Sequence, residues 1–457
     1  MHLINYWICL FLVTNNVTGF SQAQTIDTIE ISGRLQWKNK AITGYPQELK
    51  ITSANKQEYS CSIDSMGNYT CRVPPGSYTL TPRLHYYWNG DDFIRINDRV
   101  SVISINVGPE GSYGSADLLL DTIGSPAQLP AVGVANKFSA ANSRLLDEYV
   151  NKQMAYFDIP GASLAIIKHG KVIYHQVYGV STIGTGIPVT PKTLFEAGSV
   201  TKPVFAFVVM RLVEKKVLDL DRPLHQLLSF DEVSRDERYK LITARHVLCH
   251  RTGLPNWGQR DSTGHFNLLF TPGTKFGYSG EGYEYLKRVI EHITQKNISQ
   301  ILKEELLVPL QLEGLLFKGS DYLKRNAAHG HNDLHPTGIR YFEQPMMAFS
   351  MFTEAKAFSK FMLALRNKKG LKNETYEEMF RIAAERGDGV HWSLGFAIEE
   401  TPVGISYGHS GGTSSGFICN FRYFPKPDIG YVFFTNSNMG AELSIPLLTQ
   451  FIVTGKK

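Results

Sequence analysis

Residues 195–207 read FEAGSVTKPVFAF and place Ser199 and Lys202 three positions apart where a long apolar run begins. A helix over this run would bring both side chains onto one face, with Cβ atoms about 5–6 Å apart. A serine hydroxyl is a weak nucleophile until a base takes its proton. Lysine becomes that base when burial and a helix N-terminus lower its pKa from about 10.4. The stretch therefore predicts a serine nucleophile with a lysine base, although a surface serine beside a lysine lying along apolar surface remains an alternative.

Two later stretches offer partners for this pair. FTPGTKFGYSGEGYEYLKRVIEHIT places Tyr278 in a glycine-broken loop that leads into a helix, where a phenol could hydrogen-bond the lysine and relay a proton. YGHSGGTSSGF, residues 407–417, lies between two expected strands, and His409 there is followed by Ser410, Gly411 and Gly412. Glycines are common where a strand must let a ligand approach its backbone closely. Together these stretches indicate a site at the edge of a sheet.

Five stretches in order resemble the serine β-lactamase and penicillin-binding-protein superfamily, on the side of the class C β-lactamases, D-Ala-D-Ala carboxypeptidases, D-aminopeptidases and esterases. The resemblance covers residues 140–440 and implies an α/β (α+β) domain, of β-lactamase/transpeptidase type, whose antiparallel sheet is flanked by helices. It rests on FEAGSVTKPV, RLVEKKVLDLDRPL, ITARHVLCHRTGLP, TPGTKFGYSGEGY and YGHSGGTSSGF.

The resemblance also implies catalytic roles. Ser199 would be the acylated nucleophile, Lys202 its base, and Tyr278 the tyrosine of the family's Tyr-x-Asn motif. His409 stands where many members have the lysine of Lys-Thr-Gly. The backbone N–H groups of Ser199 and Gly412 would form the oxyanion hole. If His409 holds a substrate carboxylate as an imidazolium, binding should weaken as the pH rises through about 6.5.

Residues expected to contact the substrate are Gly280, Ser410 and Gly411. Gly280 departs from the family, whose members acting on peptides and β-lactams usually have asparagine at this position. A glycine there is expected to leave a gap beside the substrate, which favours esters or atypical amides over β-lactams. Trp257 and Tyr283 are candidates for the rim of the site, with core packing as the alternative for Tyr283.

The rest of the chain divides into an export signal, an all-β module and a connector. Residues 1–23 combine an apolar stretch with a small-x-small cleavage site and predict a secretory signal. Short alternating runs over 24–122 predict a β-sandwich, which resembles carboxypeptidase regulatory modules. Residues 123–137, with two prolines and no periodicity, predict a linker to a catalytic domain over 138–457. The sandwich is a candidate for contact with a cell surface or a glycan.

The cysteines bear on a possible disulfide, and two histidine clusters bear on a possible metal site. Cys61 and Cys71 would face each other across a hairpin. They could form a disulfide in an oxidising compartment, or remain two half-buried thiols. Cys249 and Cys419 read as inert core residues. No metal is expected at either histidine cluster, because neither has a carboxylate motif and S-x-x-K chemistry needs no metal; the clusters are His246 with His250, and His329, His331 and His335.

Composition narrows the function. A net charge of +5 over 457 residues, without a long basic stretch, argues against a nucleic-acid partner. No membrane span is expected after signal removal. The sequence thus predicts a secreted or periplasmic, cofactor-independent serine hydrolase acting on small esters or amides. A D-Ala-D-Ala carboxypeptidase, D-aminopeptidase or β-lactamase is the alternative within the class, and a non-catalytic penicillin-binding-like receptor is the alternative outside it.

Overall fold

The protein is described from a computed structural model that divides into two compact units, one within residues 5–128 and one mainly within 129–457. Each unit is considered by itself below. The described residues are 29–37, 40–41, 49–63, 68–82, 86–88, 93–95, 103–107, 118–120, 140–332, 334–387, 389–401 and 404–443. The predicted signal and the predicted linker lie outside them.

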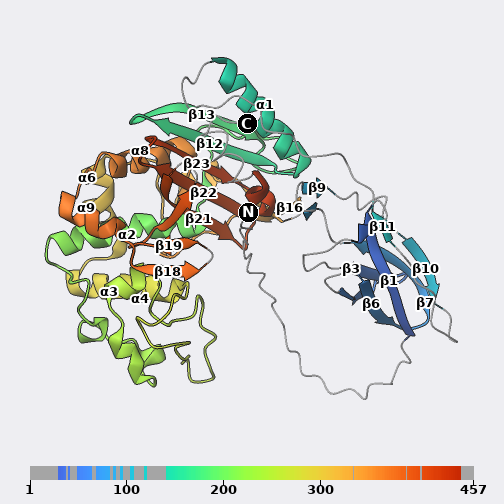
Figure 1. Ribbon diagram of the computed structural model, residues 1–457, viewed down its shortest axis with the longest axis horizontal. Helices are drawn as coiled ribbons and strands as arrows, with labels where there is room; N and C mark the ends of the chain where they lie inside the picture. The colour runs from blue at the N-terminus through green and yellow to red at the C-terminus, as the bar shows by residue number, and fades with distance from the viewer. Residues whose placement is uncertain are drawn as a thin grey trace. The chain divides into compact units, whose positions relative to one another are not determined.

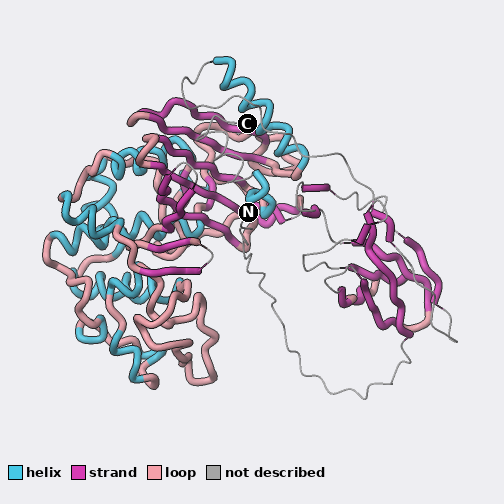
Figure 2. The backbone as a smooth tube through the Cα atoms, viewed as in Figure 1, coloured by secondary structure: helices cyan, strands magenta, loops and turns pink. Residues whose placement is uncertain are grey.

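The described part of the N-terminal unit is built from strands alone (Figure 2). One sheet has the order β11-β1-β6-β5 with β2 beside β1, and a second has the order β10-β7-β3-β4. Side chains alternate along β6, so that Tyr69, Cys71 and Val73 are buried while Asn68 and Arg72 are exposed. The prediction of an all-β N-terminal unit is confirmed. Its strands are β1 (Ile29–Trp37), β2 (Lys40–Ala41), β3 (Leu49–Ser53), β4 (Glu58–Ser60), β5 (Ser62–Ile63), β6 (Asn68–Val73), β7 (Gly76–Pro82), β8 (Tyr86–Trp88), β9 (Phe93–Arg95), β10 (Ile103–Val107) and β11 (Leu118–Leu120).

Cys61 and Cys71 form a disulfide in this unit, with their Cα atoms 4.4 Å apart. The antiparallel register pairs Ser62 with Thr70 and so brings the two cysteines opposite each other. The hairpin geometry expected from the sequence is therefore the geometry of the structure.

The C-terminal unit centres on an eight-stranded sheet of order β13-β12-β23-β22-β21-β20-β19-β18. Figure 1 shows the sheet running from β13 at the top to β18, with α2, α6, α8 and α9 to its left and α1 at its upper right. Every neighbouring pair is antiparallel, which confirms the predicted sheet. The strands are β12 (Gly161–Lys168), β13 (Lys171–Gly179), β18 (Ala384–Gly387), β19 (Val390–Trp392), β20 (Ala397–Thr401), β21 (Gly404–Thr413), β22 (Phe417–Phe424) and β23 (Ile429–Thr435).

Helix α2 (Thr201–Glu214) lies at the centre of the core, because its residues from Thr201 to Met210 are all buried. A helix that is apolar all round has to be covered on every side. The other helices are α1 (Ala140–Tyr156), α3 (Ala244–Leu248), α4 (Gly280–Thr294), α5 (Ile298–Leu302), α6 (Val308–Leu310), α7 (Asp321–Asn326), α8 (Ala355–Arg366) and α9 (Asn373–Phe380). Two-residue strands β14 (Phe195–Glu196) and β17 (Phe352–Thr353) pair beside α2, and β15 (Gly330–Asn332) pairs with β16 (His335–Gly338).

Strand β21 extends further than the sequence suggested. The stretch around His409 was expected between two strands, but it belongs to β21, which runs to Thr413 and pairs with β22 along this length. Strand β20 pairs with β21 only as far as Gly408. Within the described part of the chain, no helix has both the length and the apolar character needed to cross a membrane.

Candidate active site

Ser199 lies in a single turn of 3₁₀ helix, η1 (Gly198–Val200), directly before α2. The ammonium nitrogen of Lys202 lies 3.3 Å from the Ser199 hydroxyl and donates to it. Gly198 has φ +48°, a conformation that favours glycine, and a Cβ there would lie only 3.0 Å from the Gly412 carbonyl oxygen. The chain thus bends sharply to present Ser199 to β21, and the two predicted residues lie together.

Lys202 is almost wholly buried, with 1% of its surface exposed. Burial lowers its pKa to about 7, although the nearby Glu284 carboxylate partly opposes this by favouring the charged amine. The Lys202 amine also donates to the Ala348 carbonyl at 2.8 Å, and the Ala348 N–H donates to Glu284 Oε1 at 2.9 Å. A large fraction of Lys202 is therefore neutral near pH 7, as a base must be.

Tyr278 is the third predicted residue at this site. Its ring centroid lies 4.6 Å from the Lys202 nitrogen, and burial raises the pKa of its hydroxyl while the Ser199 hydroxyl partly offsets the rise. The hydroxyl is buried, and among the described residues it makes no well-formed hydrogen bond. Tyr278 is consequently a protonated phenol beside Ser199, suited to donate to an oxygen that develops negative charge.

The ring of His250 packs against the ring of Tyr278. The two rings lie 4.1 Å apart between centroids, and the His250 Nδ1 accepts the Ser279 N–H at 3.1 Å. The carbonyl of His250 accepts the Gly277 N–H at 2.8 Å. Its pKa is well below the usual value because the ring is buried near the Lys202 charge. His250 therefore holds the chain on both sides of Tyr278 as a neutral ring.

The far half of β21 forms the opposite wall of the site. A Cβ on Gly411 would overlap the Ala197 carbonyl oxygen and lie 3.2 Å from the Ser199 nitrogen, so only glycine fits. Gly412 is exposed. Ser410 is also exposed, and its hydroxyl accepts from Asn420 at 2.7 Å. The backbones of Ser199 and of this half-strand adjoin, as the expected oxyanion hole requires.

His409 is at the site, but its surroundings do not favour the imidazolium on which the hypothesis of a bound carboxylate depends. Its pKa is lowered to about 3, mainly by burial and then by the Lys202 charge. Its Nδ1 lies 2.6 Å from the Ser410 carbonyl oxygen and donates to it, which leaves Nε2 as a buried acceptor without a partner in the described residues. A neutral imidazole cannot attract a carboxylate by charge, so the pH dependence expected near 6.5 does not follow.

Gly280 also differs from its expected role, because no gap lies beside it. A Cβ built on Gly280 would lie 2.6 and 2.7 Å from two carbon atoms of the Trp257 ring. Its N–H donates to the Asn256 side-chain oxygen at 2.9 Å. The sequence could not place Trp257 here, because only the tertiary fold of the loop before α4 brings the indole over residue 280.

Sequence reasoning missed several neighbours of the nucleophile. Glu196 is 1% exposed and accepts the Ser415 hydroxyl at 2.6 Å while pairing with Arg340. Ala348 supplies only a backbone carbonyl, which has no sequence signature. Glu284 had no clear sequence signal, since it lies in the stretch YEYLKRVI together with the charged residues Lys287 and Arg288.

Two further histidines from the clusters make hydrogen bonds away from the site. His331 is fully buried, donates from Nδ1 to the Asn436 carbonyl at 2.8 Å, and accepts the Ile183 N–H at Nε2. His246 contacts the Leu241 carbonyl through Nδ1. Among the described residues, no group of three or more His, Cys, Asp or Glu side chains is placed to hold a metal ion. Tyr283 is core, with no exposed surface, whereas Trp257 is 38% exposed.

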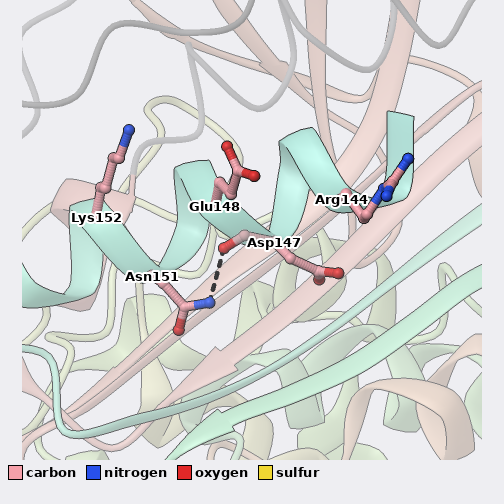
Figure 3. A pocket seen from close by; sticks show the side chains of 5 residues that line it. All are labelled: Arg144, Asp147, Glu148, Asn151 and Lys152. Atoms are coloured by element: carbon pink, nitrogen blue, oxygen red, sulfur yellow. Dashed lines mark hydrogen bonds between the residues drawn. The ribbon is translucent and has the colours of Figure 1, made fainter. Parts of the chain in front are cut away.

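Two hollows lie near the surface of this unit. The first runs along one face of α1 and contains no nucleophile (Figure 3); it is lined by Arg144, Asp147, Glu148, Asn151 and Lys152. The second, of about 350 Å³, borders the Trp257 ring and is lined by Glu232, Trp257, Arg260, Glu281, Glu284, Lys287, Arg288 and Met346. Only the second shares residues with the surroundings of Lys202.

Comparison with known proteins agrees with this geometry. The family model described as Beta-lactamase matches residues 146–447. A solved class C beta-lactamase superposes with a TM-score of 0.60 over 69% of this chain and 98% of its own, at 18% identity, which shows a shared fold.

Two curated relatives are similar in sequence. Protein flp of Staphylococcus aureus (strain NCTC 8325 / PS 47) is 22% identical over 316 residues, covering 64% of this chain and 63% of flp. Esterase EstB of Burkholderia gladioli is 32% identical over 120 residues, covering 26% of this chain and 31% of EstB. The chain thus spans less than two thirds of the length of either relative.

Proposed function

The chain belongs to the beta-lactamase family, and on that premise we propose that it is an exported serine hydrolase, acylated at Ser199, that prefers esters. One observation carries the proposal: the Lys202 amine lies 3.3 Å from the Ser199 hydroxyl, in surroundings that lower its pKa to about 7. A structural lysine has no need to be buried beside a serine hydroxyl. Glutamate, histidine and tyrosine side chains packed around the pair complete a set of groups suited to proton transfer.

The reaction would proceed in two balanced halves. Neutral Lys202 takes the Ser199 proton as the hydroxyl oxygen attacks the ester carbonyl. The N–H groups of Ser199 and Gly412 bind the oxyanion. The alcohol leaves with the proton that Lys202 took, delivered through Tyr278, and Lys202 is neutral again. Water then attacks the acyl-enzyme, its proton passes to Lys202, and the acid is released as Ser199 recovers its hydroxyl.

Esters are preferred because residue 280 offers no side-chain amide to the substrate. The space that such an amide would occupy is filled by the Trp257 ring. An amide substrate gains about 0.5–1.5 kcal/mol from one such hydrogen bond, whereas an activated ester reacts without it. The similarity to an esterase over part of the chain supports the same choice.

Export is supported by the Cys61–Cys71 disulfide, because such bonds persist in oxidising compartments. The predicted signal over residues 1–23 would direct the chain to the periplasm or beyond the cell. The N-terminal unit has no part in the proposed chemistry, and a contact with a cell surface or a glycan is proposed for it.

A fluorophosphonate label followed by a substrate panel tests the proposal. We expect the label on Ser199, and a higher kcat/KM for p-nitrophenyl butyrate than for nitrocefin or D-Ala-terminated peptides. A chain that takes no label would be a non-catalytic receptor. Faster hydrolysis of nitrocefin or of the peptides would identify a β-lactamase or a carboxypeptidase instead.

His250 should matter through its Nδ1 atom. In His250→Asn the side-chain oxygen can take the place of Nδ1 and accept the Ser279 N–H, whereas in His250→Gln the polar group lies one bond further out. We expect kcat for the Gln variant to be about tenfold below that of the Asn variant, because a buried N–H without a partner costs about 1–3 kcal/mol. Ester turnover and thermal unfolding of both variants provide the measurement; equal kcat values would remove the positioning role.

A further inference from the structure

Trp257 lies between the two segments that border Lys202. Its ring covers Gly280, which begins α4 two residues after Tyr278. On the other side the ring meets Phe349 edge-on, with centroids 5.4 Å apart and planes at 86°. Phe349 follows Ala348, whose carbonyl accepts from Lys202. With 38% of its surface exposed, Trp257 is at the rim of the site and not in the core.

This inference rests on the proposed function. An ester bound at Ser199 has three groups to place, and their positions show which of them the rim would contact. The carbonyl oxygen points to the N–H groups of Ser199 and Gly412, and the leaving alcohol points to Tyr278, which must deliver its proton. The acyl chain takes the remaining direction, past residue 280. We propose that Trp257 and Phe349 form the wall against which the acyl chain ends, and that Trp257 restricts the enzyme to short-chain acyl esters.

A hollow that could hold part of a longer chain borders the ring. The hollow of about 350 Å³ that borders Trp257 also contains Met346. Its charged lining is paired, with Arg260–Glu281 at 3.0 Å, Lys287–Glu284 at 2.8 Å and Arg288–Glu232 at 3.1 Å. Paired charges do not compete for an apolar chain that lies beside Met346. Removing the indole should therefore connect the acyl side of the site to this hollow.

The test compares p-nitrophenyl octanoate with p-nitrophenyl acetate on the full chain. In Trp257→Ala the octanoate-to-acetate ratio of kcat/KM should rise about tenfold over wild type, whereas Trp257→Phe, which keeps an aromatic wall, should change it less than threefold. Leu269→Ala removes another exposed apolar side chain of the same loop region, 68% exposed, and should leave the ratio unchanged. Each ratio is taken within one variant, so a change in total activity does not affect it.

A second measurement tests the contact itself. Gly280→Ala places a methyl group 2.6 Å from the indole, too close for an ordinary contact. In wild type this change should lower the midpoint of thermal unfolding by about 2–4 °C. In a Trp257→Ala background the loss should be much smaller, because the ring is gone and only the Asn256 carbonyl oxygen, 3.1 Å from the added carbon, remains close. This coupling does not depend on any substrate.

Three outcomes separate the possibilities. Labelling of Ser199 with an unchanged octanoate-to-acetate ratio in Trp257→Ala would overturn the acyl wall and leave the hydrolase proposal standing. No labelling of the wild type would overturn the hydrolase proposal itself. Equal effects of Gly280→Ala in both backgrounds would show that Trp257 does not cover residue 280, and would overturn the wall on structural grounds.

Discussion

Ser199→Ala should lower kcat for ester hydrolysis by about 10³-fold or more, and Lys202→Ala should lower it by a similar factor. Groups that act as one unit show strongly non-additive losses. The 3.3 Å contact between the two side chains makes them such a unit, since without the amine the hydroxyl has no base and without the hydroxyl the amine has no proton to take. The double variant should therefore be little worse than either single one.

The measurement is kcat for p-nitrophenyl butyrate, with thermal unfolding to show that each variant is folded. Lys192→Ala, which removes an exposed lysine from the loop before β14, provides a matched control and should leave kcat unchanged. Losses that multiply in the double variant would mean that Ser199 and Lys202 act independently, and the proposed mechanism would be wrong.

The acid side of the pH profile should follow Lys202. The amine must be neutral to accept the serine proton, and its pKa is about 7. Below that value kcat/KM for a neutral ester should fall about tenfold per pH unit, reaching roughly a hundredfold loss two units lower. The groups packed around the amine are Glu284, neutral His250 and His409, and the protonated phenols of Tyr278 and Tyr283. Among these groups, Glu284 is the one whose charge raises the pKa of Lys202.

Glu284→Gln then tests the assignment. The glutamate charge favours the ammonium form, so neutralising it should lower the pKa of Lys202 and move the fall in rate to lower pH. Glutamine keeps an oxygen that can accept the Ala348 N–H. Glu237→Gln, at an exposed carboxylate, should leave the profile in place. If the fall in rate is centred near pH 6.5, is unchanged by Glu284→Gln and disappears in His409→Asn, then the group that titrates is the histidine and not Lys202.

Short sequence motifs predicted more of this site than the amino-acid composition did. Three-residue spacing before an apolar run correctly placed Ser199 and Lys202 together, and a glycine-broken loop before a helix located Tyr278. The antiparallel sheet was expected from the resemblance of five short stretches to a known family. These features depend on neighbours a few residues away, which a sequence displays directly.

Contacts between distant segments could not be predicted in this way. The Lys202 acceptor is the carbonyl of a residue 146 positions later. The neutral state of His409 depends on complete burial, and the covering of Gly280 depends on how an irregular loop folds back. Burial and loop packing are properties of the assembled domain, so the gap at Gly280 was predicted wrongly and the neutral state of His409 was not predicted.

Burial of Lys202 makes its amine a better base near pH 7 but lowers the stability of the fold. An unfolded chain holds the Lys202 proton up to about pH 10.5, whereas the folded chain gives it up near pH 7. Below pH 7 this difference opposes folding in full, and it disappears only as the pH rises above 10.5. Each unit of pKa is worth about 1.4 kcal/mol, so the opposition amounts to several kcal/mol. An apolar residue such as methionine in place of Lys202 should therefore stabilise the fold while removing the proposed base.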